Sequence, residues 1–238
     1  KEQIICLIKK EVIPAMGCTE PVAVSLCVAK ATEILNKIPE KINVFLSANI
    51  LKNAMGVGIP GTGMIGLPIA IALGSLIGKS EYGLEVLKDL KSEDVEKGKK
   101  YIEEGRIDIS LKEDITDKLY IEVHCLSAGE ETIAIIKGNH TNFVHISKNG
   151  DIICDNECAA ETECSNEDTF LTYSKVFEFA NTADLNDISF ILEATRLNRA
   201  ASEYCGKGSF GHNVSKTIHG KAGKEVLGES LLSFMMAN

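Results

Sequence analysis

The loop Gly17-Cys18-Thr19-Glu20-Pro21 contains residues whose types and order could perform chemistry. Pro21 is favoured at the first position of a helix, so we expect a helix to begin here with Thr19 or Glu20 as its N-cap. Gly17 can adopt the positive φ that such a turn requires. A thiol at a helix N-terminus lies near the positive end of the helix dipole, which favours the thiolate. Cys18 is therefore a candidate reactive cysteine; the alternative is a small buried cysteine beside a helix cap.

The glycine-rich segment 56–66, Gly-Val-Gly-Ile-Pro-Gly-Thr-Gly-Met-Ile-Gly, is a second candidate site. Glycines let backbone N–H groups crowd into a concavity that holds an anion, and an apolar helix predicted at 67–74 would direct its N-terminus at the same anion. The segment is not a Walker loop, because no Lys-Ser/Thr follows the glycines, and it lacks the βαβ setting of a dinucleotide fingerprint. The alternative is a tight structural loop that packs under the next helix.

A polar turn, Gly138-Asn139-His140-Thr141-Asn142, joins two predicted strands. A histidine in such a turn can act as a proton shuttle, donate a hydrogen bond to a substrate, or simply lie on the surface. The remaining histidines, at 124, 145, 212 and 219, form no HxxxH or HExxH arrangement, so the sequence assigns them no chemistry.

Three cysteines, Cys154, Cys158 and Cys164, occur within eleven residues. Thiolate ligation of zinc or an iron–sulfur cluster is conceivable, but the paired CxxC of a structural zinc site is absent. The acidic residues between and beside these cysteines would raise the thiol pKa values and so oppose ligation.

The elements that must position these residues follow from periodicity. Apolar residues at helical spacing predict helices at 2–13, 21–36, 67–74, 81–90, 92–104, 170–180, 187–205 and 214–236, of which 21–36 is apolar nearly all round and should be buried. Alternation and turn signals predict strands at 41–47, 106–111, 119–126, 132–137, 142–147 and 151–154. Helices followed by a series of strands indicate an α+β fold with an antiparallel meander sheet packed with helices.

Composition excludes several classes of protein. The 238 residues carry a net charge of −9 with no basic run and no tryptophan, which argues against binding along a nucleic-acid backbone. No uncharged apolar run approaches the length of a membrane span, and no secretory signal pattern begins the sequence. Eight cysteines in a chain of this length therefore indicate reduced thiols and a cytoplasmic protein without membrane or nucleic-acid partners.

Several motifs in a fixed order together resemble the L-cysteine desulfidase and iron–sulfur serine dehydratase α-chain-like family. The motifs are Gly17–Pro21, Asn49 with Lys52-Asn53, Pro60–Met64, Gly83–Asp89 and His140–Asn142. The resemblance implies a serine-dehydratase-like N-terminal lobe. It also implies a lyase that removes sulfide or water from L-cysteine or L-serine, giving ammonia and pyruvate without pyridoxal phosphate.

Site residues carried over from the resemblance are Cys18 as the catalytic proton acceptor and a set of substrate-binding residues. That set is Thr19, Glu20, Lys52, Asn53, Gly61, Thr62, Gly63, His140, Thr141 and Asn142. The expected substrate is a small amino acid. A non-catalytic amino-acid-binding or interaction lobe is the alternative.

Family members are longer than this sequence. We therefore expect residues 1–238 to form a single N-terminal lobe of a two-lobe enzyme, truncated or natively split, and completed by a missing C-terminal lobe or a second chain. The resemblance implies a [4Fe–4S] cluster in the complete protein with ligands mostly outside this chain, so no metal ligand is assigned here. A homo-oligomer is a further expectation, because the long apolar C-terminal helix should be buried against something.

Overall fold

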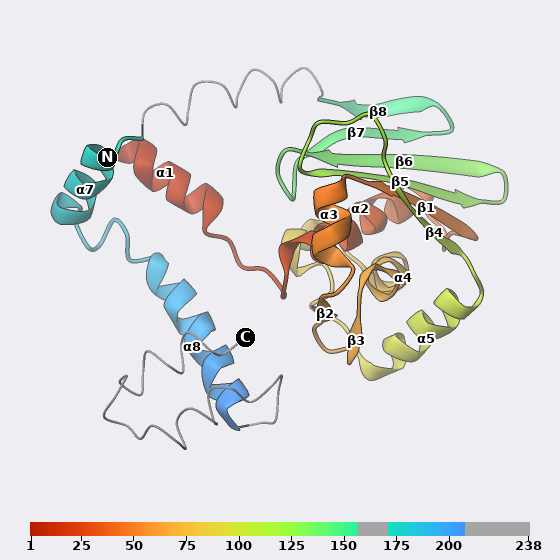
Figure 1. The fold of residues 1–238 in the computed structure, drawn as a ribbon, viewed down its shortest axis with the longest axis horizontal. Coiled ribbons are helices and arrows are strands. Elements are labelled where there is room, and N and C mark those ends of the chain that lie inside the picture. Colours follow the sequence, from red (N-terminus) through yellow and green to blue (C-terminus); the bar gives the residue numbers. More distant parts are fainter. Residues whose placement is uncertain (157–170, 208–238) are drawn as a thin grey trace. The chain divides into compact units, whose positions relative to one another are not determined.

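The computed structural model describes residues 1–156 and 171–207, and Figure 1 shows their helices and strands. These residues divide into two compact units. One unit is Pro14–Leu171, and the other combines Lys1–Ile13 with the chain that follows Leu171. The candidate residues 17–21, 52–63 and 140–142 all belong to the first unit.

A six-stranded sheet in the order β4-β1-β5-β6-β7-β8 forms one layer of the Pro14–Leu171 unit. Its strands are β1 (Lys41–Leu46), β4 (Ile107–Leu111), β5 (Tyr120–Ser127), β6 (Glu130–Lys137), β7 (Phe143–Lys148) and β8 (Asp151–Asp155). The predicted antiparallel meander is confirmed for β5 to β8. It is wrong for β4, which pairs in parallel with β1 at the sheet edge. The connection from β1 to β4 runs through several helices, and such a long crossover permits parallel pairing.

Two tight turns set the register of this meander. Ala128 and Gly129 between β5 and β6 have φ values of 51° and 78°, and Asn149 and Gly150 between β7 and β8 have 52° and 88°. Two successive positive φ values are the geometry of a two-residue hairpin turn whose twist matches that of the strands. The sequence signals Ala-Gly and Asn-Gly therefore predicted both turns correctly.

Helices form the second layer and lie on one side of the sheet (Figure 1). They are α2 (Thr19–Leu35), α3 (Ala48–Ala54), α4 (Leu67–Ile77) and α5 (Ser92–Glu103). Helix α2 packs against β5 and β6 and also against α4, and α4 packs in turn against α5. Because α2 is enclosed on both sides, most of its residues are buried, as its all-round apolar sequence predicted. Cys27 on this helix is a core residue with no exposed surface, as expected.

Small residues allow these helices to approach closely. A Cβ atom at Gly74 of α4 would lie 2.7 Å from the carbonyl oxygen of Ser25 on α2. The hydroxyl of Ser25 donates a hydrogen bond to the carbonyl of Ala70, also on α4. The backbones of α2 and α4 are thus in direct contact. This contact fixes the position of α2, whose N-terminus adjoins the candidate cysteine.

Two elements of this unit differ from the sequence prediction. The helix predicted at 81–90 is a short 3-10 helix, η1 (Ser80–Glu85), because Gly83 adopts φ 54° and ψ −127° and interrupts the helical path. Helix α3 was not predicted. Its N-cap is Ser47, whose hydroxyl accepts a hydrogen bond from the backbone N–H of Ile50 at 3.4 Å.

The second unit contains α1 (Glu2–Glu11), α7 (Tyr173–Thr182) and α8 (Ile191–Lys207), close to the helices predicted at 2–13, 170–180 and 187–205. Within this unit, Lys1 pairs with Asp187 at 2.6 Å, and the Lys9 ammonium lies 5.4 Å from the centre of the Phe190 ring. The predicted helix 214–236 lies outside the described residues, and so do Cys158 and Cys164. None of the helices in the described ranges is long and apolar enough to span a membrane.

Candidate functional site

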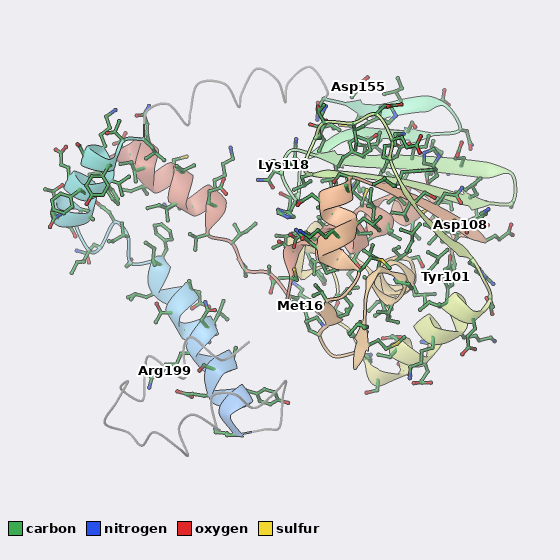
Figure 2. All side chains as sticks on the ribbon, viewed as in Figure 1. Met16, Tyr101, Asp108, Lys118, Asp155 and Arg199 are labelled. Atoms are coloured by element: carbon green, nitrogen blue, oxygen red, sulfur yellow. The ribbon has the colours of Figure 1, made fainter. Side chains whose placement is uncertain are left out.

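The candidate cysteine occupies the N-cap of α2. Cys18 has φ −70° and ψ 133°, and the helix begins at Thr19, so the prediction of Thr19 or Glu20 as N-cap is wrong. Pro21 is accordingly the third helical residue, a position whose N–H also has no partner within the helix. Gly17 has the expected positive φ of 81°. The preceding residue, Met16, which Figure 2 labels, donates its backbone N–H to the carbonyl of Leu84 at 3.1 Å and anchors the loop.

The carboxylate of Glu20 is the centre of the site. Its Oε2 accepts hydrogen bonds from the Cys18 thiol at 2.9 Å and the Thr19 hydroxyl at 3.3 Å. Its Oε1 accepts one from the Asn53 side-chain amide on α3, at 3.1 Å. The Cys18 bond contributes most to lowering the pKa of Glu20, and the Asn53 amide and the electrostatic effect of His140, in the β6–β7 turn, lower it further. Cys18 and Asn53, from two separate sequence motifs, thus donate hydrogen bonds to one carboxylate.

The thiol of Cys18 is held in its protonated form. Partial burial is the largest cause that raises its pKa, and the hydrogen bond to the Glu20 carboxylate raises it further. This is the opposite of the shift expected from the helix N-terminus alone. Burial of the sulfur, together with its hydrogen bond to the Glu20 carboxylate, outweighs the backbone N–H groups at the helix end, which lower the pKa.

The glycine-rich segment forms a small hairpin of β2 (Gly58–Ile59) and β3 (Met64–Ile65). Thr62 holds the hairpin closed, because its hydroxyl donates to the carbonyl of Ile59 at 2.7 Å and accepts from the N–H of Met64 at 2.9 Å. The Thr62 hydroxyl is therefore already engaged, whereas Gly61 and Gly63, with φ values of 78° and 66°, are exposed. An anion-holding role for the exposed glycines stays a prediction.

This hairpin packs directly on the cysteine loop. A Cβ atom at Gly17 would lie 2.8 Å from Cγ of Pro60, so only glycine permits the observed approach. Pro60 is a contact residue that the sequence did not identify by itself, although it lies within the Pro60–Met64 motif.

The other predicted residues have more peripheral places. Lys52 is exposed on α3, next to Asn53. Thr141 is exposed, and its backbone N–H donates to Oδ1 of Asn139 at 3.2 Å. The amide of Asn142 donates to the carbonyl of Lys137 at 3.0 Å. The turn that contains His140 is therefore shaped by Asn139, Thr141 and Asn142. The sequence signal that could have identified Asn139 is its Asn-x-Thr spacing, which is typical of an Asx-turn.

A second polar cluster lies on the opposite face of the sheet and was not predicted. Glu122 on β5 accepts hydrogen bonds from Lys112 at 2.6 Å, from the Tyr120 hydroxyl at 2.6 Å and from Nε2 of His124 at 2.8 Å. The other ring nitrogen of His124 lies 2.9 Å from Glu131. Alternation along β5 places these side chains on the face away from the helices.

Within residues 1–156 and 171–207, no group of three or more histidine, cysteine or acidic side chains could hold a metal ion. Among the cysteines whose side chains the structure describes, the free thiols are Cys6, Cys18, Cys27, Cys125 and Cys154. Cys27 and Cys125 are core residues, and Cys154 is on β8, where it accepts a hydrogen bond from Asn156 at 3.1 Å. A [4Fe–4S] cluster therefore has no ligand set among the described residues.

Fold and site together define an α+β protein with a mostly antiparallel sheet and a thiol–carboxylate pair at the start of its buried helix. The chain is similar to proteins named UPF0597. It is 57% identical over 237 residues to UPF0597 protein BF3560 of Bacteroides fragilis, and the match covers 100% of this chain and 55% of that protein. It is 45% identical to the UPF0597 protein of Porphyromonas gingivalis, over 99% of this chain and 56% of the relative.

A more distant UPF0597 protein, that of Dichelobacter nodosus, is 39% identical over 98% of this chain and 54% of its own length. The chain therefore spans about half the length of the curated relatives it matches. No family model and no solved structure matches the chain.

Proposed function

We propose that the complete protein is a lyase that removes sulfide or water from L-cysteine or L-serine, giving ammonia and pyruvate, and that this chain is its serine-dehydratase-like N-terminal lobe. The observation that carries the proposal is the convergence around Glu20. Cys18 and Asn53 come from motifs far apart in sequence and both donate hydrogen bonds to Glu20 at the N-terminus of α2, and His140, from a third motif, acts electrostatically on the same carboxylate. A structural cap would need the cysteine loop but not the other two motifs.

The chain's own residues suit the first step of such a reaction. The α-proton of an amino acid is weakly acidic, and a cysteine thiolate adjacent to it can act as the base. Abstraction would re-form the Cys18 thiol and leave an electron pair on the α-carbon. The exposed Gly61 and Gly63, together with Lys52, are the candidate donors to the substrate carboxylate, and His140 is a further candidate hydrogen-bond donor.

The resemblance also implies a [4Fe–4S] cluster, which as a Lewis acid would stabilise the departing sulfide or hydroxide. The described residues offer no ligand set for it, so the roles assigned to this chain are substrate binding and proton abstraction. We propose that its ligands come from the remainder of the complete protein or from a second chain.

Replacement of the thiol tests the proposal. In the complete protein, reconstituted anaerobically with iron and sulfide, Cys18→Ala should reduce pyruvate formation from L-cysteine or L-serine by at least about a hundredfold, the usual contribution of a general base. Cys6→Ala, which removes an exposed thiol of α1, is the matched control and should leave the rate unchanged. The measurement is pyruvate and sulfide release, with the cluster absorption recorded for each variant.

Two results would overturn the proposal. A Cys18→Ala variant as active as wild type would remove the base assignment. A wild-type protein that carries its cluster and binds amino acids without forming product would support the non-catalytic amino-acid-binding lobe instead.

A further inference from the structure

The Glu20 carboxylate is an anion that the fold satisfies with uncharged donors. Its three hydrogen bonds come from a thiol, a hydroxyl and an amide, those of Cys18, Thr19 and Asn53. In the described parts of the chain, no lysine or arginine forms an ion pair with Glu20. Several other carboxylates there do form an ion pair with a lysine. The pKa of Glu20 is lowered, so the group is charged at neutral pH.

We infer that Glu20 is the receptor for the α-ammonium group of the amino-acid substrate, and that it holds Cys18 as a thiol until this ammonium is bound. The inference rests on the proposed function, because it takes the ligand to be an amino acid. It assigns the chemical selectivity of the site to one side chain: a molecule with an ammonium group is accepted, and its des-amino analogue is not.

The chemistry of the hydrogen bonds supports an exchange of partners. An ammonium-to-carboxylate bond is charge-assisted and about twice as strong as a bond between neutral groups, whereas an S–H group is a weak donor. A bound ammonium would therefore displace the Cys18 thiol from Oε2. The Asn53 amide would keep the carboxylate in place from the other side through Oε1.

The same exchange activates the base. While Glu20 is unpaired, its charge and the burial of the sulfur raise the pKa of Cys18. Once the carboxylate is neutralised by the ammonium, that repulsion is removed and the pKa of Cys18 falls, so that a larger fraction of the thiol gives its proton to water and becomes thiolate. The thiolate would then be formed with the amino acid in place, and the free enzyme would be protected from adventitious alkylation or oxidation.

A candidate partner for the other end of the substrate is on a loop next to Cys18. The hairpin carrying the exposed Gly61 and Gly63 packs on the cysteine loop through the contact between Pro60 and Gly17. An amino acid with its ammonium on Glu20 could thus direct its carboxylate toward the hairpin.

Glu20→Gln in the complete protein tests the inference, since glutamine keeps the size and shape of the side chain and one acceptor oxygen but not its charge. The first readout is alkylation of Cys18 by iodoacetamide across pH 6–10, followed by mass spectrometry. We expect the variant to be alkylated several-fold faster than wild type near pH 7, because the thiol pKa falls when the carboxylate charge is removed. Glu40→Gln, an exposed carboxylate, should leave the profile unchanged.

The second readout is binding of L-alanine and of propionate, which differ in the ammonium group and carry no leaving group. Wild type should prefer L-alanine by at least about tenfold, and Glu20→Gln should lose this preference while its affinity for propionate is kept. If the alkylation profile is the same in wild type and variant, or if both ligands lose affinity equally, the inference is wrong. If the wild type prefers L-alanine but forms no pyruvate from L-cysteine or L-serine, the proposed lyase activity is contradicted and the role of Glu20 is not.

Discussion

At the scale of single residues, Gly17 connects the candidate cysteine to the glycine-rich hairpin. It has φ 81°, which L side chains rarely adopt, and any Cβ there would approach Cγ of Pro60 to 2.8 Å. We predict that Gly17→Ala lowers the free energy of unfolding by about 2–3 kcal/mol, from backbone strain and steric overlap together. Urea denaturation measures this change.

Gly63→Ala separates the two causes. Gly63 also has a positive φ, of 66°, but nothing lies within 4 Å of its Cβ position. This variant should lose only about 1 kcal/mol, the cost of the backbone conformation. Equal losses in the two variants would mean that Pro60 can move aside and that the hairpin does not fix the cysteine loop.

The site was predictable only in part at this scale. Motif order identified Cys18, Glu20, Asn53 and His140, of which the structure joins the first three by hydrogen bonds. The protonation state of Cys18 was not predictable, because a helix N-terminus is visible in sequence but the side-chain direction of Glu20 is not. The hydrogen bond of the Thr62 hydroxyl within its own hairpin was not predictable either, because a sequence does not show whether a hydroxyl bonds to its own turn or to a ligand.

At the scale of elements, β5 carries the strongest electrostatic coupling among the described strands. Burial alone would raise the pKa of Glu122, but hydrogen bonds from His124, Lys112 and Tyr120 outweigh it and lower the pKa to about 2. The same bond to Glu122, with one to Glu131, raises the pKa of His124. Each shift makes the stability of the sheet depend on pH, in opposite directions.

We therefore predict a free energy of unfolding that decreases toward acid. The folded pKa of Glu122 is about 2 and the ordinary value is 4.5, so its contribution is present above pH 4.5 and is lost as pH falls toward 2. The contribution is about 3 kcal/mol at neutral pH, and about 2 kcal/mol of it is lost by pH 3. The stability difference between wild type and Glu122→Gln, from urea denaturation at pH 3–7, should shrink accordingly.

One control variant and the opposing contribution of His124 define this result. Glu113→Gln, an exposed carboxylate, should give a difference that does not change with pH. His124 contributes in the other direction: its stabilisation is present below pH 6.5 and is lost as pH rises through its raised folded value. A pH-independent difference for Glu122→Gln would mean that the Glu122 cluster is open to solvent.

The elements themselves were predicted where local pattern decides them. Strands β5 to β8 are joined by short turns with positive-φ signals, so both their limits and their antiparallel order followed from sequence. The place of β4 did not, because its partner β1 lies about sixty residues earlier and no local signal specifies that pairing. Helix α3 was missed because a seven-residue helix carries too short a periodic pattern.

At the scale of the whole molecule, the hydrophobic core of the described residues lies entirely within the Pro14–Leu171 unit. Helices α1 and α7 of the other unit contain no buried residue. Two core residues are thiols: Cys27 on α2, with its sulfur 3.3 Å from the carbonyl of Ala134, and Cys125 on β5. Burial raises the pKa of Cys125 to about 12 and that of Cys27 well above its ordinary value.

These thiols report on the cooperativity of the unit. Iodoacetamide should label the exposed Cys6 rapidly, whereas Cys27 and Cys125 should react at least about a thousandfold more slowly, because labelling requires unfolding of a core that is stable by 5 kcal/mol or more. Since α2 and β5 pack against each other, both rates should rise with urea along the same slope. Peptide mass spectrometry over a urea series below the unfolding midpoint measures each site. If Cys27 is labelled faster than Cys125, and its rate depends less steeply on urea, α2 opens independently of the sheet. The helix whose N-cap is Cys18 is then a locally opening element and not part of a rigid scaffold.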